Sequence, residues 1–168
     1  QVAIFEQDER LYCYPSLVRV LPAERIILID RTRERRLRPS LVVEHLRRLH
    51  ERPPRFRPMD FLEALFNAYR VLAQRHGSGA LQRSPVERLM QVYELLTLLP
   101  GQSREYSKQE FARDIYLLDR SGTTLTKGGF VVSFPSSTGT RSVSDLFLAI
   151  TETGQERQYW GIALTKDG

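Results

Sequence analysis

Residues 84–134 decide the predicted fold, and they read SPVERLMQVYELLTLLPGQSREYSKQEFARDIYLLDRSGTTLTKGGFVVSF. Two capping boxes open helices in this stretch, one at Ser84–Glu87 and one at Ser107–Glu110. In such a box the serine hydroxyl accepts a hydrogen bond from the amide three residues on, and the glutamate reaches back to the serine amide. Gly122 offers a left-handed stop for the second helix, and the alternation of residues 123–134 around a Gly-Gly pair is typical of a hairpin.

The order of these elements is helix, turn, helix, hairpin, and this order resembles that of a winged helix. We therefore predict a winged-helix-like element at 84–134. If it bound DNA in the usual way, the helix after Ser107 would be the recognition helix. Its three cations and three carboxylates cancel, however, and carboxylates repel the phosphate backbone.

The rest of the chain predicts an α+β fold. Short apolar runs open the sequence, and Ile26–Ile29 is the most continuous, as expected of a buried strand. Ser40 is expected to cap the next helix, and Asp60 with Glu63 forms a third capping box. The prediction is short N-terminal strands, a four-helix middle and C-terminal antiparallel strands. The last group of strands is expected at residues 124–126, 130–134, 146–150 and 159–164.

The length and composition predict one compact domain over residues 1–168. Hydrophobic residues make up 41% of the chain, which is enough for a real core. A subdivision is also considered, into a part with strands and a basic helix at 1–76 and a helix–helix–hairpin part at 84–168. Because neither end carries an obvious tail, we expect the chain to be an excerpt of a larger protein.

Apolar runs in the sequence are far shorter than the roughly 20 residues that a membrane span needs. There is no signal-peptide pattern, and one cysteine, Cys13, cannot form an internal disulfide. We therefore expect a cytoplasmic protein without a membrane partner. Cys13 is expected to be a buried strand residue rather than a nucleophile.

Positive charge is concentrated between residues 31 and 57. The whole chain carries a net +5, but this segment alone holds ten arginines and three glutamates. Such a concentration favours an anionic partner, of which nucleic acid is the commonest. The chain has 22 arginines and only 3 lysines, so a codon bias is an alternative explanation of the arginine excess.

These observations predict a non-enzymatic nucleic-acid-binding domain of a larger bacterial assembly, with DNA favoured over RNA. Arginine forks would hold phosphates without reading bases. The alternative is a protein-interaction or oligomerisation domain, because arginines also bind protein carboxylates and the central helices carry apolar residues on more than one face. The expected nucleic-acid-binding residues are Arg33, Arg35, Arg36, Arg38, Arg47, Arg48, Arg52, Arg55, Arg57, Lys127 and Arg141.

Catalytic and metal chemistry find little support in the sequence. His45 and His50 are five residues apart, which places them on different helix faces rather than at the spacing of a zinc pair. Asp145 and Glu152 bracket a predicted strand and are the best acidic candidates for a hydrolase or nuclease. The loop at 136–142 has the hydroxyls of an anion nest but lacks the Walker pattern. We predict no metal, no cofactor and no catalytic residue.

Overall fold

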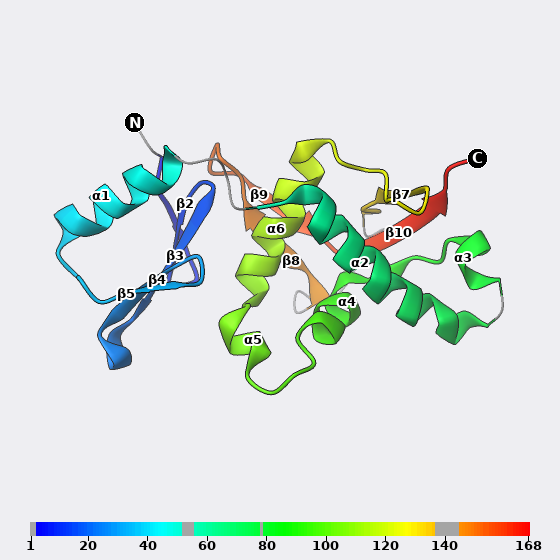
Figure 1. The fold of residues 1–168 in the computed structure, drawn as a ribbon, viewed down its shortest axis with the longest axis horizontal. Coiled ribbons are helices and arrows are strands. Elements are labelled where there is room, and N and C mark those ends of the chain that lie inside the picture. Colours follow the sequence, from blue (N-terminus) through cyan, green and yellow to red (C-terminus); the bar gives the residue numbers. More distant parts are fainter. Residues whose placement is uncertain (1–2, 52–55, 78, 137–144) are drawn as a thin grey trace. The chain divides into compact units, whose positions relative to one another are not determined.

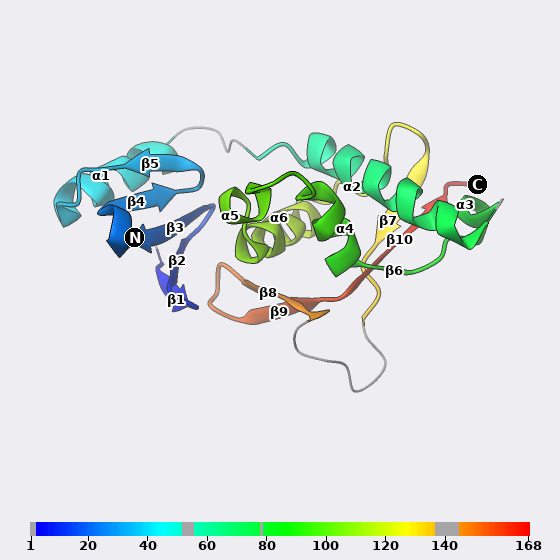
Figure 2. The ribbon, with the colours of Figure 1, turned by 90° about the horizontal axis from the view of Figure 1, so that it is seen from below.

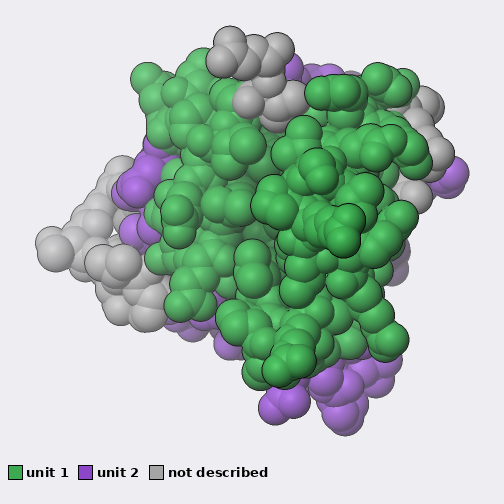
Figure 3. Space-filling view, turned by 90° about the vertical axis from the view of Figure 1, so that its left-hand side faces the viewer, with its two compact units in different colours: residues 1–55, 150–155 green, residues 56–149, 156–168 purple. Residues whose placement is uncertain are grey.

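The computed structural model describes residues 3–51, 56–77, 79–136 and 145–168, and it shows an α+β fold (Figure 1). The predicted fold class is confirmed. The chain divides into two compact units, coloured separately in Figure 3. Unit 1 comprises residues 1–55 and 150–155, and unit 2 comprises residues 56–149 and 156–168. The subdivision considered from the sequence, between residues 76 and 84, falls inside unit 2.

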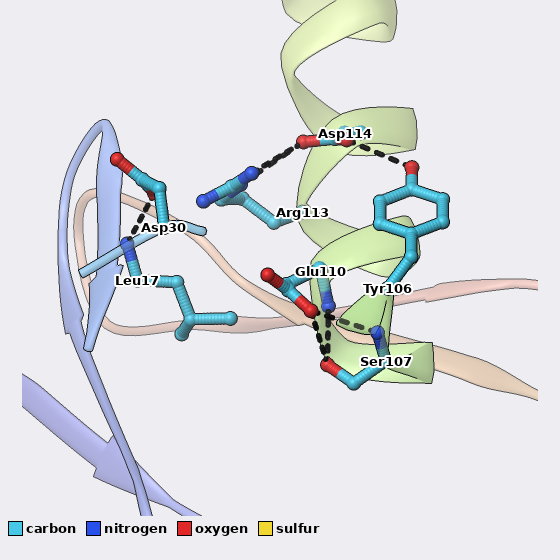
Figure 4. A network of polar contacts seen from close by, with 7 residues as sticks. All are labelled: Leu17, Asp30, Tyr106, Ser107, Glu110, Arg113 and Asp114. Atoms are coloured by element: carbon cyan, nitrogen blue, oxygen red, sulfur yellow. Dashed lines mark hydrogen bonds and ion pairs between the residues drawn. The ribbon is translucent and has the colours of Figure 1, made fainter. Parts of the chain in front are cut away.

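Unit 1 is built on a five-stranded antiparallel sheet whose strands follow one another in chain order. Its turns use left-handed backbone at non-glycine residues, among them Asp8 and Asp30, a residue type that tolerates this conformation. The Asp30 carboxylate accepts a hydrogen bond of 3.1 Å from the Leu17 amide, which links two strands (Figure 4). The strands are β1 (Phe5–Gln7), β2 (Arg10–Cys13), β3 (Ser16–Leu21), β4 (Ile26–Ile29) and β5 (Thr32–Glu34), with a 3₁₀ turn η1 (Pro22–Glu24) between β3 and β4.

Helix α1 (Pro39–His50) packs one apolar stripe on this sheet. The stripe was predicted from the spacing of its residues, and it covers the cluster of Cys13, Val18 and Ile29. The expected Ser40 cap is wrong, because α1 begins two residues earlier than that cap predicts and has Arg38 at its N-cap without a side-chain cap. Pro39 supplies the helix start instead, since its fixed φ suits the first helical position. The stripe consists of Val42, Leu46 and Leu49.

A second cluster of unit 1 uses a residue from the far end of the chain. Ile150 is 5% exposed and packs with Tyr12 and Leu17. In the same part of unit 1, Gly154 lies so close to Phe5 that an added Cβ would overlap the phenyl ring. Residues 150–155 therefore complete the core of a unit whose other residues all precede position 56.

Unit 2 has a helical core. Helix α2 packs against α4 and α6, and Phe111 of α6 is fully buried among four aromatic rings. The helices are α2 (Pro58–Ala73), η2 (Gln74–His76), α3 (Ala80–Arg83), α4 (Leu89–Leu96), α5 (Gln102–Glu105) and α6 (Lys108–Ser121). No helix among the described residues is long and apolar enough to cross a membrane.

The predicted boundaries of α6 are confirmed. Ser107 and Glu110 form a complete capping box, in which the Glu110 amide donates to the Ser107 hydroxyl over 3.3 Å and the Ser107 amide donates to the Glu110 carboxylate over 2.7 Å (Figure 4). Gly122 ends the helix in the left-handed conformation at φ +71°.

The other two predicted capping boxes are wrong. Ser84 lies outside α4, and Glu87 belongs to a short strand, β6 (Glu87–Arg88), where its carboxylate bonds to His76 over 2.8 Å. Helix α2 begins at Pro58, and the Glu63 carboxylate accepts from the Lys127 amide over 2.6 Å rather than from a helix start. In both cases the glutamate carboxylate bonds to a residue distant in the sequence, so it does not bond to the helix start as a capping box requires.

The strands of unit 2 form two small sheets, and Figure 2 shows β9 running on into β10. Strand β10 lies between β6 and β7. The predicted hairpin after α6 is present as a turn through Gly129, with a single bridge between Leu125 and Val131. Two helices and a turn thus follow one another at 89–133 as predicted, but the short α5 lies between the two helices and β7 pairs with β10 rather than within a hairpin. The remaining strands are β7 (Phe130–Ser133), β8 (Phe147–Ile150), β9 (Glu156–Tyr159) and β10 (Gly161–Lys166).

Candidate functional site

The connection between β5 and α1 carries part of the predicted arginine set, and one ion pair fixes its geometry. The Arg36 guanidinium donates to both oxygens of Glu34, over 3.0 and 2.8 Å, and the Arg36 amide donates to the same carboxylate over 2.8 Å. These bonds hold the pKa of Glu34 down at about 2, from an ordinary value of 4.5. Glu34 therefore stays ionised and anchors the chain that leads into α1.

Three further predicted arginines also have carboxylate partners. Arg33 pairs with Glu24 over 2.8 Å, and Arg48 pairs with Glu44 one turn earlier on α1. Each pair is largely exposed to solvent, so it contributes little to stability, but it partly neutralises the cation. The third of these arginines, Arg57, belongs to unit 2 and lies 3.6 Å from the carboxylate of Asp60.

Arg35, Arg38 and Arg47 differ from these arginines, and we call them the free arginine trio. All three are exposed, and none of their side chains forms a hydrogen bond or ion pair with a residue that the structure describes. Two of them belong to the β5–α1 connection, and Arg47 lies on the solvent side of α1. At the 1.5 Å rise of an α-helix, Arg47 lies about 12 Å along the axis from Pro39.

The remaining predicted residues do not extend this set within unit 1. Lys127 is an exposed residue of unit 2, in the turn that follows α6. Arg52, Arg55 and Arg141 lie outside the described residues, as does most of the predicted anion-nest loop. The trio and its paired neighbours are thus the part of the prediction that the structure places in one unit.

The histidines and the cysteine have structural roles in this fold. His50 bonds the Cys13 carbonyl over 3.0 Å, and His76 bonds the buried carboxylate of Glu87. Cys13 is 1% exposed, as predicted for a strand residue, and burial raises the pKa of its thiol. A thiol in that state is a poor nucleophile. Among the described residues, no three metal-binding side chains form a cluster.

The acidic candidate Asp145 has a partner, and so does Asp114, another acidic residue of unit 2. Asp145 lies 3.6 Å from Arg88, so its charge is partly neutralised. On α6, Asp114 accepts from Arg113 over 2.8 Å and from the Tyr106 hydroxyl over 2.8 Å (Figure 4). This buried network ties the start of α6 to the segment before it, which is a structural role.

A polar cavity in unit 2 is a site that sequence reasoning missed. It has a volume of about 170 Å³, and it lies between the end of α6, strand β7 and strand β9. Asp119 is one of the three carboxylates counted on the helix after Ser107, whereas Arg157 and Tyr159, which contact it here, were not singled out from the sequence. No sequence signal was available, because Asp119 and Tyr159 are 40 positions apart.

Comparison with known proteins returned nothing, since no family model, no curated protein and no solved structure matches the chain.

Proposed function

We propose that the protein is a non-enzymatic nucleic-acid-binding domain that contacts the phosphate backbone through unit 1, with DNA as the favoured ligand. The observation that carries the proposal is the free arginine trio. Arg35, Arg38 and Arg47 are exposed cations without a carboxylate partner among the described residues, whereas neighbouring arginines are paired.

The proposal needs a ligand that offers several negative charges at short intervals. An exposed arginine gains little from a single anion in water, because solvent and salt screen the attraction. A nucleic-acid strand carries one phosphate per about 3.4 Å of axis, so the roughly 12 Å of α1 before Arg47 corresponds to three or four phosphates. Duplex DNA doubles this charge density, which favours it over a single strand.

The Arg36–Glu34 pair supports this arrangement indirectly. It fixes the backbone of the connection that carries Arg35 and Arg38, so these two side chains extend from an ordered segment. Preorganised contacts lose less conformational freedom on binding than contacts from a mobile segment. Arg36 itself would act as a positioning residue in this scheme.

The salt dependence of binding tests the proposal quantitatively. Three phosphate contacts predict a slope of about −2.7 in log K against log salt, so affinity should fall about 40-fold between 50 and 200 mM salt. We would measure binding of the whole chain to a labelled DNA duplex by fluorescence anisotropy, with an RNA duplex and heparin as further ligands. Binding that is absent at low salt, or insensitive to salt, would contradict the proposal.

A charge-matched pair of variants separates a local site from general basicity. The first is Arg35→Ala/Arg38→Ala/Arg47→Ala, which should bind weakly and lose most of the salt slope. The second removes three exposed cations of unit 2 and changes net charge by the same amount, so it should retain both affinity and slope. An equal loss in both variants would refute a site in unit 1. The control variant is Arg75→Ala/Lys108→Ala/Lys166→Ala.

A second candidate function, protein interaction, rests on a different observation. Leu98 and Leu99 are consecutive residues between α4 and α5, and they are 75% and 67% exposed. Adjacent large apolar side chains with this exposure are typical of a contact surface. Self-association predicts a mass that rises with concentration in light scattering and falls to that of a monomer in Leu98→Ser/Leu99→Ser. A monomer at every concentration would exclude association between copies of the chain.

A further inference from the structure

The cavity of unit 2 lies where two paired strands separate. Strands β7 and β10 pair from Phe130 opposite Lys166 to Ser133 opposite Ala163. Beyond that last pair the chain continues on one side into Phe134 and on the other into β9. Both segments line the cavity, and the last turns of α6 line it as well. The opening thus results from the end of a strand ladder.

A charged pair is fixed in this cavity by a tyrosine. One oxygen of Asp119 accepts a hydrogen bond from the Tyr159 hydroxyl over 2.8 Å and forms an ion pair with the Arg157 guanidinium at 2.9 Å. The guanidinium carbon of Arg157 also lies 5.6 Å from the centre of the Tyr159 ring, so the arginine is held in two ways. Burial, together with the adjacent carboxylate, raises the pKa of Tyr159, so its hydroxyl remains a donor at neutral pH.

This arrangement leaves hydrogen-bonding capacity of both kinds. The other oxygen of Asp119, and the Nε and Nη1 atoms of Arg157, form no bond with any residue in the described part of the chain. The side chain of Asp119 is 28% exposed and that of Arg157 is 54% exposed, so both can be reached from solvent. The cavity therefore offers one negatively charged hydrogen-bond acceptor, the second oxygen of Asp119, and positively charged hydrogen-bond donors on Arg157.

The pairing of these charges selects the kind of ligand. Because Asp119 neutralises Arg157, a simple anion is attracted by one group and repelled by the other, and the same holds for a simple cation. A ligand that carries both a carboxylate and an ammonium can meet each group with its opposite. The rest of the lining combines the apolar Leu118, Val132 and Phe134 with hydroxyl and amide side chains, which suits a short side chain without charge.

We propose that the cavity bounded by Asp119, Arg157 and Tyr159 binds a small zwitterion, a free α-amino acid with a short uncharged side chain. Its carboxylate is bound by Arg157 and its ammonium by Asp119. Tyr159 acts as a positioning residue, because it orients both of them. The volume of about 170 Å³ lies below the range of roughly 300–1,000 Å³ that larger ligands occupy, which limits the ligand to a few heavy atoms beyond its two charged groups.

Ligand-detected NMR or calorimetry on the whole chain tests this proposal with three matched probes. Valine carries both charges, 3-methylbutanoate lacks the ammonium, and isobutylamine lacks the carboxylate. We expect saturable binding of valine, with each analogue weaker by about tenfold or more, since each loses a charge-assisted bond. An absence of binding by any amino acid with a short uncharged side chain up to about 10 mM, or equal binding of an analogue, would overturn the proposal.

Two variants locate the binding site. Arg157→Gln and Asp119→Asn should each weaken valine binding by about tenfold or more, whereas Arg75→Gln, a surface change elsewhere in unit 2, should leave it unchanged. The fluorescence of Trp160, the residue next to Tyr159, reports whether each variant is folded. Valine binding that persists in both folded variants would refute the assigned site, and the probe series on the unmodified chain remains decisive if a variant does not fold.

Discussion

Phe111 gives the sharpest test of how unit 2 is held together. Its side chain is fully buried, and its ring centroid lies 4.8 Å from that of Phe147 and 5.4 Å from that of Tyr93. The rings of Phe61 and Tyr106 lie 6.1 and 6.2 Å away. Truncation of this side chain removes the common neighbour of four aromatic residues from α2, α4, β8 and the segment before α6.

The expected cost follows from the kind of cavity that is left. Phe111→Ala should lower the free energy of unfolding by about 3–5 kcal/mol, as is typical of a buried phenylalanine. Phe111→Leu keeps most of the apolar volume but loses the ring pairs, so we expect about 1–2 kcal/mol. A whole domain is stable by only about 5–15 kcal/mol, so the alanine variant should be severely weakened.

Urea unfolding followed by tryptophan fluorescence measures this loss in the correct unit, because the one tryptophan of the chain, Trp160, belongs to unit 2. With a slope of about 2 kcal/mol per molar urea, Phe111→Ala should lower the midpoint by roughly 1.5–2.5 M. The control is Val71→Ala, since Val71 is 50% exposed on α2 and should change stability by less than about 0.5 kcal/mol. A Phe111→Ala loss as small as that of the control would refute the packing described here.

Two further predictions concern charge and capping. Ser107→Ala should cost about 1–2 kcal/mol in the same urea assay, because it removes the cap of α6 and a 2.9 Å bond to the buried Glu110; a change below about 0.5 kcal/mol would contradict this role. For Glu34, the pKa in the folded state is about 2, below its ordinary 4.5, so its stabilising contribution is present above pH 4.5 and is lost as pH falls towards 2. Arg36→Ala should raise the midpoint of the Glu34 carboxyl titration, followed by NMR, towards 4.5, and an unchanged midpoint would refute the assigned cause.

Local signals predicted the helices well where no distant residue competed for them. The capping box of Ser107 and Glu110 was found as predicted, because both partners are within one turn of each other. The similar pattern at Ser84 failed, since Glu87 pairs as a strand with β10 and bonds to His76. A sequence pattern shows which local hydrogen bonds a side chain can form, but it does not show whether a residue distant in the sequence bonds to that side chain instead.

The candidate sites show the same limit. The exposed arginines of the segment 31–57 were predicted, and the pairing of Arg48 with Glu44 follows from their helical spacing. Arg33 instead pairs with Glu24, a residue that only the folding of the sheet brings near. The polar cavity could not be predicted at all, because the end of α6 and β9 meet through tertiary packing alone.

The return of the chain to unit 1 has a consequence for how the protein is made. Ile150 supplies part of the buried cluster around Tyr12 and Leu17, yet a ribosome adds it more than 130 residues after Leu17. Residues 1–55 emerge well before the β8–β9 turn, and they cannot complete their own interior until that turn arrives. A fragment that stops at position 55 should therefore be a poor substitute for unit 1, and a working short version would need the late turn restored by a linker.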